Sequence, residues 1–101
     1  MGLFVTMNHF QVEPARSGEF EEHWRGRRTY LAEVPGFVRF ALLRGEEAGH
    51  YVSHASWESR AAFEAWTRSD AFRRAHAQSP LPKGLLQGHP RLEVWEALLE
   101  Q

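Results

Sequence analysis

The sequence predicts an α+β domain whose elements follow the order β-α-β-β-α-β, the ferredoxin-like arrangement of an antiparallel sheet with two helices. Three observations lead to this prediction. Short apolar runs alternate with longer runs of helical period, and clusters of Pro, Gly and polar residues separate them. Two of the short runs follow each other with no helix between them. With 101 residues, 43% hydrophobic and 25% charged, the chain is expected to form a single domain over residues 1–101, and a two-domain enzyme is excluded.

The first half of the chain begins with a strand and continues with a helix. Residues 3–12 are apolar on both alternation faces, which is typical of a strand covered on both sides. Residues 14–18 interrupt this run, and Ser17 is a candidate N-cap for a helix of about four turns that Pro35 and Gly36 end. The row of residues at helical spacing is Phe20, Trp24, Arg27, Tyr30 or Leu31, and Val34.

The second half supplies a hairpin, a helix and a last strand. Residues 36–44 and 51–57 read as strands, and the polar residues 46–49 join them in an antiparallel pair. Ser59 is a candidate N-cap for a helix that continues to about residue 77, with a kink or restart expected at Ser69-Asp70 because both residue types prefer caps to helix interiors. Residues 79–90 contain too many helix and strand breakers for regular structure, and residues 91–99 alternate like a strand.

The two-sided apolar character of the first strand predicts a partner for the second face of the sheet. Two helices cover only one face of a four-stranded sheet, so the other face needs a further layer. We therefore expect a homodimer in which the antiparallel sheets pack face to face. The alternative is a monomer in which the 78–90 loop covers that face.

Charge, cysteine content and local motifs exclude several classes of function. Twelve basic and thirteen acidic residues give no signal for nucleic-acid binding, and the chain has no Cys for thiolate metal sites or thiol nucleophiles. No signal peptide or membrane-spanning run is evident, so a cytoplasmic protein without membrane contact is expected. Zinc-protease, phosphate-loop and serine-hydrolase motifs are absent from the sequence. His50 and His54 do not suggest a chelating zinc pair, because four residues of strand span about 13 Å.

Three residues are candidates for chemistry, each with a structural alternative. Asn8 is the only asparagine and lies in an apolar strand, where it either bonds backbone at a bulge or serves as a polar donor in an apolar pocket. Trp66 extends the apolar face of Phe63, which is more typical of a core residue than of a cofactor contact. His76 ends the second helix, where the helix dipole favours it whatever its function. On a straight helix Trp66 and His76 lie about 15 Å and roughly 80° apart, so they could border only a large flat ligand, more so if the helix bends.

The residues of the second helix also carry a family resemblance. The chain reads W-E-S at 57–59, A-F-E-A-W at 62–66 and S-D-A-F-R-R-A-H at 69–76, with F-V-T-M-N at 4–8 and V-P-G-F at 34–37. These segments resemble the IsdG-type heme-degrading monooxygenases of the antibiotic biosynthesis monooxygenase (ABM) superfamily, which are dimeric α/β barrels. The resemblance covers roughly residues 3–77 and is weak in the 78–90 loop. The W-E-S…F…W pattern marks the superfamily, and the added histidine and asparagine narrow it to the heme branch.

The resemblance implies a role for each candidate residue. His76 would be the proximal ligand of heme iron, Asn8 the distal amide that hydrogen-bonds oxygen bound to iron, and Trp66 the wall that pushes the porphyrin out of plane. Heme would then be both cofactor and substrate, with electrons from an external donor. Further candidate contacts to heme are Phe4 and Phe63 as walls of the pocket and Arg25 or Arg28 as partners of the propionates, although an arginine is more commonly a solvated surface charge.

Two other functions remain open at this stage. The first is a cofactor-free monooxygenase of aromatic polyketide or quinol substrates, in which Trp66 and Asn8 line an organic substrate's pocket and His76 is incidental. The second is a small dimeric protein that binds heme or another planar ligand without turnover.

Two departures from the family pattern bear on the choice between these functions. His9 should point away from the pocket, toward the dimer interface, and the 78–90 loop with His89 could reshape the pocket mouth.

Overall fold

The computed structural model describes residues 2–78 and 80–101; Met1 and Ser79, the first residue of the predicted 79–90 loop, lie outside the described residues. Over these residues the chain forms a four-stranded antiparallel sheet of order β2-β3-β1-β4. The elements are β1 (Phe4–Gln11), η1 (Pro14–Arg16), α1 (Ser17–Arg25), η2 (Leu31–Glu33), β2 (Phe37–Arg44), β3 (His50–Trp57), α2 (Arg60–Thr67), α3 (Asp70–His76) and β4 (Arg91–Glu96). The predicted ferredoxin-like order is confirmed. The sheet of one chain is open and does not close into a barrel.

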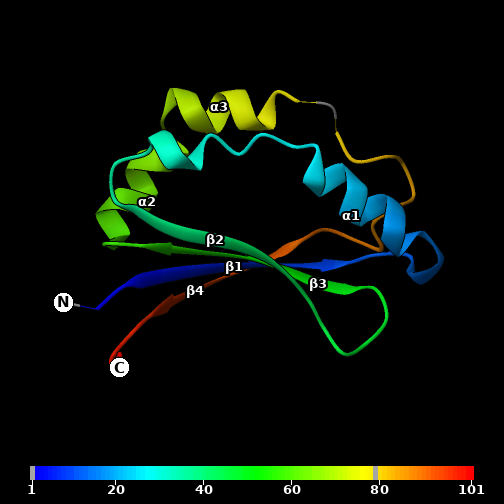
Figure 1. The fold of residues 1–101 in the computed structure, drawn as a ribbon, viewed down its shortest axis with the longest axis horizontal. Coiled ribbons are helices and arrows are strands. Elements are labelled where there is room, and N and C mark those ends of the chain that lie inside the picture. The colour runs from blue at the N-terminus through cyan, green and yellow to red at the C-terminus, as the bar shows by residue number, and fades with distance from the viewer. Residues whose placement is uncertain (1, 79) are drawn as a thin grey trace.

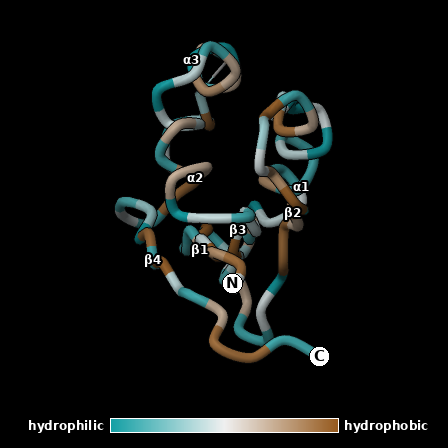
Figure 2. The backbone as a smooth tube through the Cα atoms, turned by 90° about the vertical axis from the view of Figure 1, so that its left-hand side faces the viewer, coloured by the Kyte–Doolittle hydropathy of each residue, from teal (hydrophilic) through white to brown (hydrophobic). Residues whose placement is uncertain are grey.

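The helices lie over one face of the sheet (Figure 1), and Figure 2 shows α1 and the α2–α3 pair side by side above the strands. The residues of β1 divide accordingly. Phe4, Thr6 and Phe10 are buried on the helical side, whereas Val5 and Met7 point to the opposite face and stay partly exposed. Among the described residues no element covers that opposite face. The pattern expected for a strand covered on both sides is therefore met on one side only within this chain.

The first helix is shorter than its sequence period predicts. The expected helix runs to Val34, but α1 ends at Arg25, with Gly26 as its C-cap, and Tyr30 takes a left-handed backbone with φ of 59°. A residue in that conformation cannot continue a right-handed helix. The apolar residues predicted beyond Arg25 still contribute to the core, because Leu31 is buried there from the short turn η2. Ser17 is also not the N-cap: it is the first residue of α1, and the turn η1 leads directly into the helix.

The predicted break in the second helix is confirmed. The chain forms two short helices, α2 and α3, in place of one. The side chain of Ser59 caps α2 by accepting a hydrogen bond from the Ala62 N–H, and the side chain of Ser69 caps α3 by accepting one from the Phe72 N–H. None of the helices formed by residues 2–78 and 80–101 has the length and apolar character needed to span a membrane.

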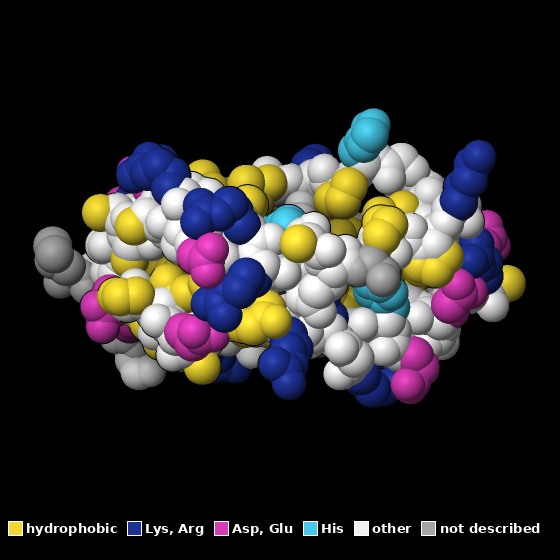
Figure 3. Space-filling view, turned by 90° about the horizontal axis from the view of Figure 1, so that it is seen from above, with side chains coloured by type: hydrophobic (Ala, Val, Ile, Leu, Met, Phe, Trp, Pro, Cys, Tyr) yellow, Lys and Arg dark blue, Asp and Glu magenta, His cyan; other side chains and the backbone are white. Residues whose placement is uncertain are grey.

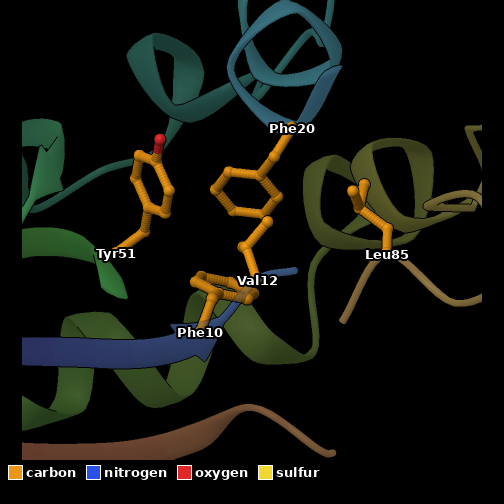
Figure 4. Packing of buried hydrophobic residues seen from close by; sticks show 5 residues of the cluster. All are labelled: Phe10, Val12, Phe20, Tyr51 and Leu85. Atoms are coloured by element: carbon orange, nitrogen blue, oxygen red, sulfur yellow. The ribbon is translucent and has the colours of Figure 1, made fainter. Parts of the chain in front are cut away.

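The core consists of two aromatic clusters beneath the helices. One joins α1 to the sheet and includes a residue of the 79–90 loop (Figure 4). In that cluster Phe20 packs on Tyr51 with ring centroids 4.7 Å apart, and Leu85 is fully buried. The loop is irregular, as predicted, but it packs on the helical side of the sheet. It therefore does not cover the face opposite the helices, which we call the bare face. The second cluster lies beneath α2 and contains Phe4, Leu31, Ala55 and Trp57.

Candidate active site

A cavity of about 460 Å³ lies between the sheet and the helices, and we call it the inner cavity. Thr6 and Asn8 of β1 and Ser53 of β3 form part of its floor. Its walls are mainly aromatic and come from α1, β2, α2 and α3. The volume falls in the range of small-molecule and cofactor sites, and an apolar lining with a few polar groups is typical of such sites.

The break between α2 and α3 brings Trp66 and His76 together. Their ring centroids are 6.3 Å apart, far closer than a straight helix would place them. The reason lies at Ser69, whose hydroxyl accepts from the Phe72 N–H at 3.1 Å and donates to the Trp66 carbonyl at 2.7 Å. One serine thus ends α2, starts α3 and fixes the bend. The two residues therefore border one cavity, and the 15 Å separation expected on a straight helix does not apply because the helix breaks at Ser69.

His76 lines this cavity, and one of its ring nitrogens forms no hydrogen bond to a described residue. Its Nδ1 lies 2.8 Å from the carbonyl oxygen of Phe72, and its ring stacks on the Phe72 ring with centroids 3.9 Å apart. A carbonyl oxygen only accepts hydrogen bonds, so Nδ1 carries a proton and Nε2 of the neutral ring keeps its lone pair. A histidine oriented in this way through its other nitrogen is the usual arrangement of a metal ligand.

Asn8 lies on the floor of the same cavity, on the sheet side. The structure gives its side chain no hydrogen bond to any described residue, and β1 keeps unbroken register there, opposite Ser53 on one side and Leu92 on the other. The bulge expected under the structural alternative is therefore not formed at Asn8. The amide is available to a ligand in the inner cavity.

Two indole groups in the cavity wall lack hydrogen-bond partners. Within residues 2–78 and 80–101, the Nε1 atoms of Trp24 and Trp66 are buried and have no acceptor. Trp66 also packs on Trp57, with centroids 5.1 Å apart, and on Phe63, at 6.0 Å. Phe63 lines the cavity, whereas Phe4 is buried, with its ring centroid 5.6 Å from that of Phe63, and is not among the lining residues.

The arginines expected near the ligand, Arg25 and Arg28, do not line the inner cavity, and Arg25 lines a second cavity beside it. Arg25 is exposed and forms ion pairs with Glu21 and Glu22, and Arg28 is exposed and bonds Gln78 through its backbone N–H. Arg27, for which the sequence suggested no role, lines the inner cavity. The sequence did contain an indication that Arg27 faces inward, since it is the one charged residue in the otherwise apolar row of the predicted first helix.

A second cavity, of about 420 Å³, adjoins the inner one and is more polar. Trp24 and Phe40 line both cavities, and their rings stack with centroids 5.8 Å apart, so this pair stands between them. In the second cavity the buried hydroxyl of Tyr51 donates to Glu21. This hydrogen bond lowers the pKa of Glu21, and burial raises the pKa of Tyr51. Seen from above, basic and acidic side chains are interspersed over the helical face (Figure 3).

His9 lies on the bare face of the sheet, as predicted. Its Nε2 is 2.7 Å from the Glu93 carboxylate and its Nδ1 is 3.1 Å from Nε2 of His50. The hydrogen bond from His9 lowers the pKa of Glu93. In the part of the chain that the structure describes, no group of three or more His, Cys, Asp or Glu side chains is arranged to hold a metal ion.

Comparison with known proteins places the chain in a family. Residues 3–78 match the family model described as antibiotic biosynthesis monooxygenase, and the chain belongs to this family. It is 34% identical over 85 residues to a mycobilin-producing heme oxygenase of Mycobacterium tuberculosis, covering 79% of both chains. It is 38% identical over 73 residues to the deoxynogalonate monooxygenase of Streptomyces nogalater, covering 71% of this chain and 53% of that one.

Solved structures agree with both relationships. The heme degrader MhuD of Mycobacterium tuberculosis, with two hemes bound in its active site, has a TM-score of 0.77 and 28% identity, over 97% of this chain and 98% of that one. SnoaB, a cofactor-independent oxygenase of Streptomyces nogalater, has a TM-score of 0.69 and 27% identity, over 97% of this chain and 95% of that one. A heme-bound degrader and a cofactor-independent oxygenase therefore share this fold. The fold alone does not decide between these two functions, so the argument for one of them has to come from the residues of the site.

Proposed function

We propose that residues 1–101 act as one domain that binds heme in the inner cavity, one per chain, and cleaves the porphyrin oxidatively with O2 and electrons from an external donor, releasing iron. The observation that carries this proposal is the position of His76. His76 lines an aromatic cavity whose floor holds Asn8, its Nε2 forms no hydrogen bond to a described residue, and the sequence has no Cys to compete as a ligand. Similarity to the mycobilin-producing heme oxygenase supports the proposal.

The residues of the inner cavity fit heme. When bound, heme supplies a redox-active iron together with the porphyrin that is cleaved. His76 would hold the iron through Nε2, and the Phe72 carbonyl fixes the orientation of its ring. Phe63 and Trp66 offer apolar surface to a flat macrocycle, and the amide of Asn8 offers a hydrogen-bond donor on the sheet side.

The experiment is a hemin titration followed by turnover. We expect a Soret band that saturates at one equivalent per chain, and its loss or shift in His76→Ala. His89→Ala is the matched control, because His89 is exposed in the 79–90 loop and should bind hemin as the wild type does. Adding a reductant in air should then consume oxygen, bleach the Soret band and yield an open-chain tetrapyrrole by mass. Hemin binding that survives His76→Ala overturns the assignment of the ligand, and bound heme that stays intact indicates a binding protein without turnover.

A cofactor-free monooxygenase of aromatic polyketide or quinol substrates is the second candidate. Similarity to the deoxynogalonate monooxygenase favours it, and the aromatic walls of the inner cavity suit a planar organic substrate as well as heme. In this case Asn8 and Trp66 contact the substrate and His76 has no role. Failure of hemin to bind, with oxygen uptake on an aromatic polyketide or quinol and no loss of rate in His76→Ala, would favour this candidate.

We also propose that two copies associate through the bare faces of their sheets. Trp95 and Leu43 are 53% and 45% exposed, and Val5 and Met7 lie on the same face. These apolar side chains share the face with the polar cluster of His9, His50 and Glu93, and exposed apolar side chains of this kind mark an interaction surface. Light scattering coupled to size exclusion should give twice the mass of 11.7 kDa, and Trp95→Arg should reduce it toward the monomer. A monomeric wild type would contradict this part of the proposal.

A further inference from the structure

Two histidines and a glutamate on the bare face form a continuous row of hydrogen bonds, which we call the histidine cluster. The ring of His9 lies at its centre, with Nε2 at 2.7 Å from the Glu93 carboxylate and Nδ1 at 3.1 Å from Nε2 of His50. The second carboxylate oxygen of Glu93 accepts from Arg91 at 2.7 Å. The three members come from β1, β3 and β4, so the pairing of the strands brings them together.

The hydrogen bonds determine where the protons lie when both rings are neutral. A carboxylate only accepts hydrogen bonds, so His9 donates from Nε2 and keeps its lone pair on Nδ1. That lone pair accepts from the Nε2–H of His50, whose own lone pair is then on Nδ1. The neutral cluster is therefore fully hydrogen-bonded between its members.

The cluster can take up one proton without losing a hydrogen bond, but it cannot take up two. A proton added to Nδ1 of His50 leaves both bonds in place. When both rings are protonated, an N–H of His9 faces an N–H of His50 across 3.1 Å, and two positive charges meet with no acceptor between them. Histidine ordinarily changes its charge between about pH 5 and 8. Mild acid therefore adds positive charge to the bare face and breaks the bond between the two rings.

The other charges of the bare face do not compensate this added charge. Residues paired directly across antiparallel strands share a face, so the strand registers assign the ionisable groups of this face. They are His9 on β1, Arg39 on β2, His50 and His54 on β3, and Arg91 and Glu93 on β4. In the loop before β3, Glu46 and Glu47 form no ion pair with the His50 ring within the described residues. With neutral histidines the strands thus present two arginines and one glutamate, and each proton adds to this positive excess.

Pairing of two copies through this face would make the added charge costly. In a twofold pair the same face of each copy meets the other, so charges of like sign are brought together. In the single chain the side chains of His9 and Glu93 are 19% and 29% exposed, so water still reaches the cluster. Removing that water costs little for neutral rings that are hydrogen-bonded and much more for rings that carry a charge.

We propose that the histidine cluster makes the association of two copies through their bare faces dependent on pH, so that pairs form when the rings are neutral and separate in mild acid. This inference rests on the association proposed above and specifies its regulation. The hydrogen bond from His9 lowers the pKa of Glu93, so this carboxylate stays ionised while the histidines titrate. A separated copy binds more protons than a paired one, and association therefore weakens as pH falls.

The test measures the dissociation constant of the pair by analytical ultracentrifugation at about pH 8 and about pH 5.5, at one ionic strength. Each proton that pairing expels raises this constant about tenfold over that interval, because histidine ordinarily titrates about one pH unit above its lower end. For one or two protons per pair, we expect a rise of roughly tenfold to a hundredfold in the wild type.

Three variants assign the effect to the cluster. The double variant His9→Gln with His50→Gln keeps polar side chains but removes both titrating rings, and it should lose most of the rise. His50→Gln alone leaves the bond between His9 and Glu93 and gives a second reading if the double variant does not pair. His54→Gln, on the same face but outside the cluster, should keep most of the rise. His23→Gln, on α1 at the other side of the sheet, is the matched control and should behave as the wild type does.

The outcomes separate this inference from the association on which it rests. A wild type that is monomeric at both pH values overturns both. A wild type that pairs with the same dissociation constant at both pH values overturns only the role of the cluster. A rise that persists in the double variant and disappears in His54→Gln assigns the effect to His54 and also overturns the inference. Far-UV circular dichroism at the lower pH completes the test, because separation accompanied by loss of secondary structure would mean that acid unfolding, and not the cluster, separates the copies.

Discussion

Replacing Ser69 with alanine should damage both the stability of the chain and its binding of hemin. The variant loses two hydrogen bonds, one accepted from the Phe72 N–H at 3.1 Å and one donated to the Trp66 carbonyl at 2.7 Å. Loss of an N-cap costs about 1 kcal/mol, and the second bond adds about 1 kcal/mol. We therefore expect a loss of about 2 kcal/mol, which lowers the melting temperature of a domain of this size by about 10 °C.

The assay is urea unfolding followed by tryptophan fluorescence, with a hemin titration of each folded variant. Ser59→Ala is the matched control, because it removes one cap bond, from the Ala62 N–H at 3.1 Å, at the other end of α2. It should cost about 1 kcal/mol and leave hemin affinity unchanged. Ser69→Asp keeps the acceptor for α3 but cannot donate to the Trp66 carbonyl, so it should fall between the wild type and Ser69→Ala.

Hemin affinity should fall in Ser69→Ala because the bend at Ser69 holds Trp66 and His76 at 6.3 Å. The reasoning would be refuted if Ser69→Ala were as stable as the wild type. It would also be refuted if Ser59→Ala weakened hemin binding as much as Ser69→Ala does, because the bend would then have no specific role.

Three further predictions test the fold. Gly36→Ala should destabilise the chain by more than about 1 kcal/mol in urea unfolding, because Gly36 has φ of +84° and the added Cβ would collide with the Cβ of Ala62 on α2. An unchanged unfolding midpoint would contradict this close approach. Trp57→Ala should cost about 3–5 kcal/mol by the same assay, because the side chain is fully buried, and a loss below 1 kcal/mol would show that the second cluster is not a packed core. Glu93→Gln tests the carboxylate beside His9. The pKa of Glu93 is lowered in the folded chain, so the stabilisation by this carboxylate is present above the ordinary pKa of a glutamate and is lost as pH falls through the folded-state pKa. The stability difference between Glu93→Gln and the wild type should therefore disappear in acid, and a difference that grows as pH falls would reverse the assigned sign.

Features set by local chemistry could be predicted from the sequence. Ser59 and Ser69 cap their helices as expected, because a serine oxygen satisfies backbone N–H groups of the same turn and needs no tertiary partner. The strands and the hairpin follow from alternation and turn residues in the same way. Trp66, His76 and Asn8 could be selected from their positions in the pattern, and the structure places all three around one cavity.

Features set by contacts between distant segments could not be predicted. The apolar period continues past Arg25, yet the helix stops there, because the following segment is held to the end of α3 by the bonds of Arg27 and Gln78. The left-handed backbone of Tyr30 leaves no trace in residue type, since glycine and asparagine are the usual signals. Whether Phe4 or Phe63 reaches the cavity surface depends on which one lies in front, and alternation does not decide this.

The sheet order leaves β2 and β4 as free edges, where unpaired backbone groups invite the addition of strands from other chains. Both edges carry charged side chains that oppose such growth. Arg39 and Arg44 lie on β2, and Arg91 and Glu96 lie on β4, all of them exposed. A strand from another chain that aligned with either edge would bury these charges, which is costly. These charges protect the sheet from extension into aggregates through its edges.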